Sequence, residues 1–141
     1  MTRPVPGGFA AGMIRSGILN PHLLALLARV RHTNTLVIAD SMFPHWPGLT
    51  EVDLSLVYGI PTVPEVVRAV LQQWNAGTAW MAAEFQQFNP PEVLEEFRGA
   101  FGSTRLEFEP HLQLKARVPG AIGLIRTGER RIYTNVVLES A

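Results

Sequence analysis

Short apolar runs alternate along the chain with longer stretches in which apolar residues recur at helical spacing. Residues 35–39 are β-branched or apolar throughout, which is typical of a strand buried on both faces of a sheet. Asn20 and Pro21 favour a helix start, and apolar side chains then recur every three or four residues as far as Val30. Applied to the whole chain, periodicity and breaker residues predict helices at 21–30, 64–75, 91–101 and 110–118 and strands at 35–39, 52–56, 78–83, 104–109, 121–126 and 132–138.

The order of these elements predicts an α/β fold. Gly77 and Gly102 are expected to end the second and third helices, and the segment 89–91 is expected to cap the third. The last two strands are expected to pair across a turn at residues 127–129. This alternation favours a three-layer sandwich with a mostly parallel sheet and some antiparallel pairing at the end.

A chain of 141 residues fits one domain, which we place at residues 13–141. Residues 1–12 are rich in proline and glycine and are expected to form a flexible N-terminal extension. No Gly-x-Gly-x-x-Gly sequence and no Walker-type phosphate loop occur, so we expect no dinucleotide site despite the α/β pattern.

Composition narrows the classes of partner. Twelve basic and twelve acidic residues give a net charge of zero without any basic block, so nucleic acid and anionic membranes are not expected as partners. No apolar run approaches the roughly eighteen residues of a membrane span. Only 17% of the residues are charged, which favours a surface partly covered by other subunits.

The chain has no cysteine, which excludes disulfides, thiolate metal sites and cysteine nucleophiles and fits a cytoplasmic protein. No pair of histidines has the close spacing of a zinc-binding helix, so no metal site is expected.

Two polar residues bracket the apolar run at 35–39. His32 precedes the run, and Asp40 closes it at the strand end where open α/β folds place their ligands. An imidazole and a carboxylate near one sheet are suited to moving a proton on a small polar ligand. The alternatives are an idle histidine near a helix C-terminus and an aspartate that caps loop amides.

Two further polar pairs follow near the C-terminus. His111 and Lys115 are four residues apart and lie on one face of the helix predicted from Pro110. Tyr133 and Asn135 are two apart in the last predicted strand and point to the same face. Both pairs offer groups that bind hydroxyls. The alternatives are a solvated surface pair and the solvent face of an edge strand.

Five short segments carry a family resemblance: residues 32–40 (HTNTLVIAD), 58–61 (YGIP), 83–84 (AE) with 89–90 (NP), 126–129 (RTGE) and 133–135 (YTN). In this order, over residues 13–138, the chain resembles the D-ribose pyranase and L-fucose mutarotase family. The resemblance implies that His32 is the catalytic histidine. It implies that the sugar is bound by Asp40, His111, Lys115, Tyr133 and Asn135.

The resemblance also implies a Rossmann-like sandwich that needs neither a metal nor an organic cofactor. It implies a ring-shaped homo-oligomer, often a decamer, with sites at subunit contacts, so that Tyr133 and Asn135 would complete a neighbour's pocket. Arg31 and the loop 41–46 depart from the pattern of the ribose-type members. Ribose-like and fucose-like sugars are therefore both kept as candidate substrates.

The expected function is that of a cytoplasmic mutarotase or pyranase. This isomerase would interconvert anomers, or pyranose and furanose forms, of a free aldose by acid/base ring opening. His32 would protonate the ring oxygen, and Asp40 would either orient that imidazole or hold a hydroxyl. The alternative functions are a non-catalytic sugar-binding or regulatory module on the same scaffold, and an assembly protein whose polar pairs only bridge subunits.

Overall fold

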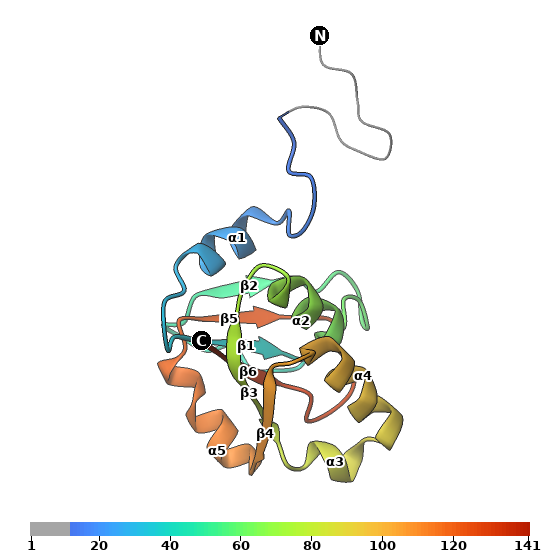
Figure 1. The fold of residues 1–141 in the computed structure, drawn as a ribbon. Coiled ribbons are helices and arrows are strands. Elements are labelled where there is room, and N and C mark those ends of the chain that lie inside the picture. The colour runs from blue at the N-terminus through green and yellow to red at the C-terminus, as the bar shows by residue number, and fades with distance from the viewer. Residues whose placement is uncertain (1–11) are drawn as a thin grey trace.

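A computed structural model describes residues 12–141, and all strands within that range belong to one mixed sheet (Figure 1). The strand order is β2-β5-β1-β6-β3-β4. Strand β6 runs antiparallel to its neighbours β1 and β3, and the other pairs are parallel, so the predicted mostly parallel sheet is confirmed. The strands are β1 (Thr35–Ala39), β2 (Glu51–Asp53), β3 (Ala76–Ala82), β4 (Arg105–Glu109), β5 (Gly123–Arg126) and β6 (Val136–Ser140). Apart from Gly12, the extension predicted at residues 1–12 lies outside the described residues.

The helices begin and end largely where local signals place them. The Asn20 side chain accepts a hydrogen bond from the Leu23 N–H at 2.9 Å and so caps the first helix. Gly102, at a φ of 59°, ends the fourth helix. The helices are α1 (Pro21–Ala28), α2 (Val63–Leu71), α3 (Phe85–Phe88), α4 (Pro91–Phe101), α5 (His111–Ala116) and the short 3₁₀ helix η1 (Val118–Gly120). The sequence did not predict α3.

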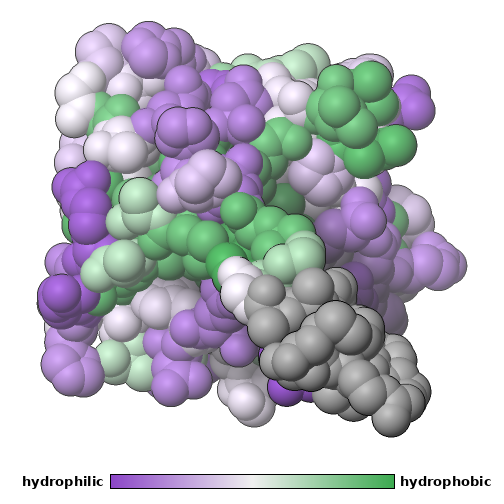
Figure 2. Space-filling view, turned by 90° about the horizontal axis from the view of Figure 1, so that it is seen from above, coloured by the Kyte–Doolittle hydropathy of each residue, from purple (hydrophilic) through white to green (hydrophobic). Residues whose placement is uncertain are grey.

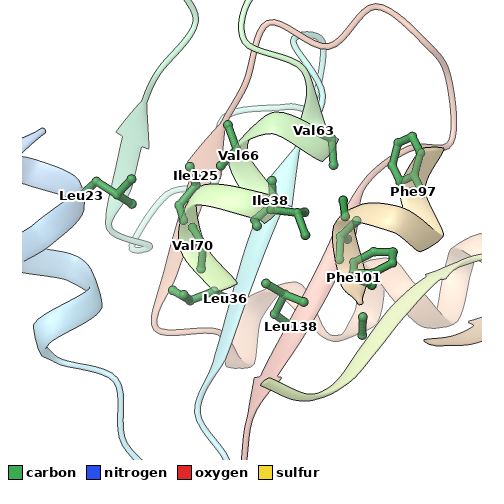
Figure 3. Close-up of a cluster of buried hydrophobic side chains, with 14 of the residues drawn as sticks. Leu23, Leu36, Ile38, Val63, Val66, Val70, Phe97, Phe101, Ile125 and Leu138 are labelled. Atoms are coloured by element: carbon green, nitrogen blue, oxygen red, sulfur yellow. The ribbon is translucent and has the colours of Figure 1, made fainter. Parts of the chain in front are cut away.

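Helices cover both faces of the sheet, which confirms the three-layer sandwich. On one face, side chains of α1, α2 and α4 pack against the sheet in a single cluster. Figure 3 shows Val66 and Val70 of α2 and Phe101 of α4 next to Ile38 and Leu138 of the central strands. Burial of such side chains is the main source of stability in the fold.

The opposite face of the sheet is covered by α5, η1 and the loop 41–50. Leu114 and Val118 pack there against Val37, Leu124 and Val137. Seen from the α1 side, a band of hydrophobic side chains crosses the molecular surface (Figure 2). Apolar side chains that remain largely exposed are also found in the loop before α2, where Leu56 and Tyr58 are 76% and 60% exposed. Apolar surface of this kind is typical of subunit contacts.

The predicted pairing of the last two strands is wrong. Strand β1 lies between β5 and β6, so residues 127–135 cross the end of β1 and do not form a hairpin turn. The physical reason is burial. Val136, Val137 and Leu138 are all buried, so their strand is favoured in the interior of the sheet, with another strand on each side. Strand β6 obtains them between β1 and β3.

The prediction that Gly77 ends the second helix is also wrong. Helix α2 ends earlier, at Leu71, and Gly77 lies inside β3. The register between β3 and β6 shifts between Ala76 and Thr78. A glycine inside a strand is common at such irregularities, because it has no side chain to place there.

Candidate functional site

A pocket of about 290 Å³ opens where β1 ends, between α5 and the segment that leads into β6. Its polar groups come from three parts of the chain, and its apolar wall comes from the loop after β1 and from Ile132. The pocket is lined by Asp40, Met42, Phe43, Pro44, His111, Lys115, Ile132, Tyr133 and Asn135. It thus brings together five of the six predicted site residues. A concave site with a few convergent polar groups is the usual form of a small-molecule site.

Asp40 is the acidic group of this pocket and is only 7% exposed. Its carboxylate accepts a hydrogen bond from the Met42 N–H at 3.0 Å. Burial raises the pKa of Asp40, while the main-chain N–H groups of Met42 and Phe43 and the charge of Arg126 act in the opposite direction. The fold therefore keeps a partly desolvated carboxyl at the pocket, where it can bind a ligand hydroxyl.

Asn135 connects β6 to the end of β1. Its Oδ1 accepts a hydrogen bond from the Asp40 main-chain N–H at 2.7 Å. Because Oδ1 is occupied, the amide NH₂ is the group of Asn135 that remains to donate to a ligand. This bond joins residues 95 positions apart in the chain, and it fixes the two polar groups relative to each other.

Tyr133 reaches the pocket in a different way from the one predicted. It does not belong to a strand, and its φ of 57° places its backbone in the left-handed region. The pattern of same-face residues in a strand therefore does not apply to Tyr133 and Asn135, although both line the pocket. The Tyr133 ring packs edge-on to the His111 ring, with 5.3 Å between centroids.

His111 and Lys115 lie one turn apart on α5, as predicted, and both line the pocket. The His111 main-chain N–H donates to both carboxylate oxygens of Glu84, at 3.1 and 3.2 Å. The His111 Nδ1 is buried and has no hydrogen-bond partner among the described residues. A ligand or a water molecule in the pocket is the natural partner for such a group.

His32 lies apart from the other five residues. It precedes β1, at the opposite end of the strand from Asp40, and its side chain is exposed. Its Nδ1 is 2.6 Å from the main-chain oxygen of Ala141. An N–H at Nδ1 that donates to this oxygen leaves Nε2 as the free nitrogen for proton transfer. Within one chain, Asp40 therefore does not orient the His32 imidazole.

Backbone strain occurs next to His32 and in the pocket lining. Within residues 12–141, the non-glycine residues with positive φ are Thr33, at 66°, and Tyr133, at 57°. A β-branched residue in this region is a conformational outlier, and such outliers gather at functional sites. One of the two follows His32 directly, and the other lines the pocket.

Sequence patterns did not indicate the buried charged residues that lie around the pocket. Glu129 is 2% exposed and accepts hydrogen bonds from the N–H of Val63 at 3.1 Å and from the Arg131 guanidinium at 2.9 Å. Arg126 donates to the main-chain oxygen of Phe43 and to Glu51, which ties the pocket loop to β2. In segment 126–129 the sequence predicts a turn and carries part of the family resemblance, but no local pattern indicates that its charges are buried.

Other features of the described chain point to no further chemistry. No helix between residues 12 and 141 combines the length and the apolar character that crossing a bilayer requires. Within the same range, no three or more histidine, aspartate or glutamate side chains gather in a way that could hold a metal ion. Larger cavities of about 400 and 440 Å³ lie beside α4 and α1, and neither contains a predicted site residue.

Comparison with known proteins gives a consistent set of relatives. The sequence pattern of the RbsD / FucU transport protein family matches residues 13–141. A D-ribose pyranase of Geobacillus kaustophilus is 40% identical over 128 residues, which cover 91% of this chain and 93% of that protein. A D-ribose pyranase of Chromobacterium violaceum is 38% identical over 128 residues and covers 91% and 97%, respectively.

Two solved structures extend the comparison. The structure of Bacillus subtilis RbsD complexed with D-ribose superposes with a TM-score of 0.84 at 32% identity, and the match covers 92% of this chain and 98% of that one. The fucose mutarotase of Streptococcus pneumoniae in complex with L-fucose has a TM-score of 0.74 at 18% identity, covering 86% and 92%. At that identity, the second likeness supports the fold alone.

Proposed function

This chain belongs to the RbsD / FucU transport protein family, and we propose on that premise that its pocket binds a free monosaccharide and interconverts the anomers or ring forms of that sugar. It is an isomerase of the D-ribose pyranase and fucose mutarotase type. The observation that carries the proposal is the convergence of Asp40, His111, Lys115, Tyr133 and Asn135 on one pocket. Carboxylate, imidazole, ammonium, phenol and amide groups together can bind several hydroxyls of one sugar ring.

The proposed chemistry needs only proton transfer. A proton passes from the anomeric hydroxyl to solvent water while another is delivered to the ring oxygen, and the bond between that oxygen and C1 breaks to give the open-chain aldehyde. After rotation about the C1–C2 bond, a hydroxyl attacks the carbonyl, its proton passes to the imidazole, and the carbonyl oxygen takes a proton back from water. We assign the transfer at the ring oxygen to His32, because an imidazole both gives and takes a proton near neutral pH. The five pocket residues hold the hydroxyls during these steps.

The position of His32 bears on the assembly. Because His32 does not lie in the pocket of its own chain, we propose that the partner subunit's His32 completes the site. A ring-shaped homo-oligomer, a decamer by resemblance, would bring the partner subunit's His32 to the pocket of the neighbouring chain. The exposed apolar side chains of Leu56, Val57 and Ile60 support the proposal, since they need a covering surface.

D-ribose is the substrate we propose first. Relatives at 38–40% identity are D-ribose pyranases, and the RbsD structure at 32% identity holds D-ribose. A pocket of about 290 Å³ has room for one monosaccharide. We propose the cytoplasm as the compartment, which suits a chain without cysteine.

Saturation-transfer NMR of D-ribose and L-fucose tests the proposal, because it measures exchange between ring forms directly. We expect the wild-type protein to accelerate exchange of at least one of the sugars. His32→Ala is expected to lower the rate about 10²–10⁴-fold, the usual contribution of a positioned acid/base group. His22→Ala, which removes an exposed histidine of α1, is the matched control and should leave the rate unchanged.

The outcomes separate the candidate functions. Saturable sugar binding without faster exchange would mean a binding module on this scaffold. If the protein neither binds any aldose tested nor accelerates its exchange, the proposed function is overturned.

A further inference from the structure

Residues 84–89, which we call the α3 segment, contact both parts of the pocket that come from the C-terminal half of the chain. At its start, Glu84 accepts hydrogen bonds from the His111 main-chain N–H at 3.1 and 3.2 Å. At its end, the Asn89 Nδ2 donates to the main-chain oxygen of Ile132 at 3.0 Å. One short segment therefore holds the first residue of α5 and the peptide group that leads into Tyr133.

The Asn89 bond acts on a strained piece of backbone. The carbonyl of Ile132 belongs to the peptide bond directly before Tyr133, whose φ of 57° is unfavourable for a residue with a side chain. On the other side, the Thr134 hydroxyl donates to the Arg131 main-chain oxygen at 2.7 Å. A conformation of this kind persists only when its surroundings fix it. The two bonds enclose the strained residue.

Aromatic packing connects the same groups. The Phe88 ring of α3 lies 5.2 Å from the Tyr133 ring, between centroids. The Tyr133 ring in turn lies 5.3 Å from the His111 ring at an interplanar angle of 81°. Edge-to-face contacts in this distance range are favourable and direction-dependent. The α3 segment thus contacts the phenol ring, which in turn packs against the imidazole.

We propose that Glu84 and Asn89 are positioning residues for sugar binding. Neither lines the pocket, and both act through residues that do. Glu84 fixes the start of α5 and thereby His111, while Asn89 fixes the Ile132 carbonyl and thereby Tyr133. This inference rests on the proposed function, because it assumes that Tyr133 and His111 bind the sugar.

The sharpest test is Asn89→Asp, because it keeps the shape of the side chain and removes its N–H donors. The new carboxylate would face the carbonyl oxygens of Ile132 and Phe85, to which Asn89 now donates. We expect the KM for ribose to rise about tenfold while kcat changes less than about threefold, since ground-state positioning is lost and the acid/base group is untouched. Asn89→Gln, which keeps the donor on a longer arm, is expected to recover part of the affinity.

A double-mutant cycle separates positioning from general loosening of the fold. In a Tyr133→Phe background the sugar-binding hydroxyl is already absent, so Asn89→Asp is expected to raise KM much less than in the wild type. An equal factor in both backgrounds would overturn the role of Asn89 in positioning Tyr133. Asn20→Asp is the matched control, because aspartate caps α1 as well as asparagine does, and its KM should equal that of the wild type.

Glu84 gives a second pair of variants. Glu84→Gln keeps an acceptor oxygen for the His111 N–H and is expected to resemble the wild type. Glu84→Leu removes the acceptor and is expected to raise KM severalfold. If Asn89→Asp does not fold, Asn89→Ser, whose side chain is too short to reach Ile132, takes its place with the same expectation. Unchanged KM values in an active wild-type background overturn this inference alone, whereas an inactive wild type overturns the proposed function.

Discussion

His32 and Asp40 lie at opposite ends of β1, and the strand Thr35–Ala39 separates them. The five steps from Thr35 to Asp40 span roughly 17 Å of extended chain. Direct contact between the two side chains of one subunit is therefore impossible. If both act on one sugar, they must belong to different copies of the chain.

This geometry predicts complementation between two inactive variants. His32→Ala retains an intact pocket, and Asp40→Asn retains an intact His32. After denaturation and joint refolding in equal amounts, about a quarter of the sites in a randomly mixed assembly would combine both wild-type residues. We expect ribose exchange, measured by saturation-transfer NMR, to return to about that fraction of the wild-type rate.

The matched control for complementation uses two variants of the same pocket. Asp40→Asn and Lys115→Ala both damage the pocket lining, so no mixture of them can form an intact site. No recovery is expected for this mixture. A mixture of His32→Ala and Asp40→Asn that forms mixed oligomers by native mass spectrometry but stays inactive would contradict the shared site.

Asp40→Asn is expected to increase stability while it lowers activity. Burial raises the pKa of Asp40 above its ordinary value of 3.8, so the ionised carboxylate is less favourable in the folded chain than in the unfolded one. The contribution of the protonated Asp40 carboxyl to stability is fully present at low pH and is lost as the pH rises through the folded-state pKa. The gain from Asp40→Asn should thus be larger at pH 7 than near pH 4 in urea unfolding.

Exposed Asp53 provides the control for this pH dependence. Asp53→Asn is expected to change the free energy of unfolding by less than about 0.5 kcal/mol at either pH. An Asp40→Asn variant that is less stable than the wild type at pH 7 would show that the carboxylate stabilises the fold. It would contradict the expectation that burial makes the ionised Asp40 unfavourable.

Asn135→Ala is expected to destabilise the fold by about 1–3 kcal/mol, because it leaves the buried Asp40 N–H without an acceptor. Urea unfolding measures this loss. Asn34→Ala removes a similar bond, to the Arg31 N–H, but at an exposed position where water replaces the side chain. Its expected cost is below about 1 kcal/mol. Equal losses of stability for the two variants would contradict the expectation that the buried bond of Asn135 contributes more than the exposed bond of Asn34.

Glu129→Gln is expected to cost about 2 kcal/mol or more at pH 7. Burial alone would raise the pKa of Glu129, but hydrogen bonds from the Arg131 side chain and from the main chain of Arg131 and Val63 lower it overall. The stabilisation is present above the ordinary carboxyl pKa of 4.5 and is lost as the pH falls through the folded-state value. The deficit of Glu129→Gln should therefore shrink below about pH 4.

Glu107→Gln is the control for this pH effect, because Glu107 pairs with Arg105 at the surface. Exposed ion pairs contribute about 0–1 kcal/mol, so little change is expected at any pH. A Glu129→Gln deficit that is constant from pH 7 to pH 3.5 would contradict the ionised state of Glu129 in the fold.

Sequence patterns predicted most elements, because these depend on neighbours within a few residues. Asn20 caps α1 and Gly102 ends α4, as local chemistry requires. Helix α3 was missed because it has four residues, fewer than periodicity can reveal. Segment 89–91 is expected to cap α4, and Pro90 of that segment does occupy the cap position. The Asn89 side chain instead donates to the main-chain oxygens of Phe85 and Ile132, which no local pattern indicates.

The sequence by itself determined the α/β class, the family and the identities of the polar groups now found at the pocket. Tertiary structure alone decided which of them meet. Strand order placed β1 between β5 and β6, which brings Asp40 to Asn135 and leaves His32 at the far end. The reason is that periodicity records local burial, whereas strand order is set by contacts between segments far apart in the chain.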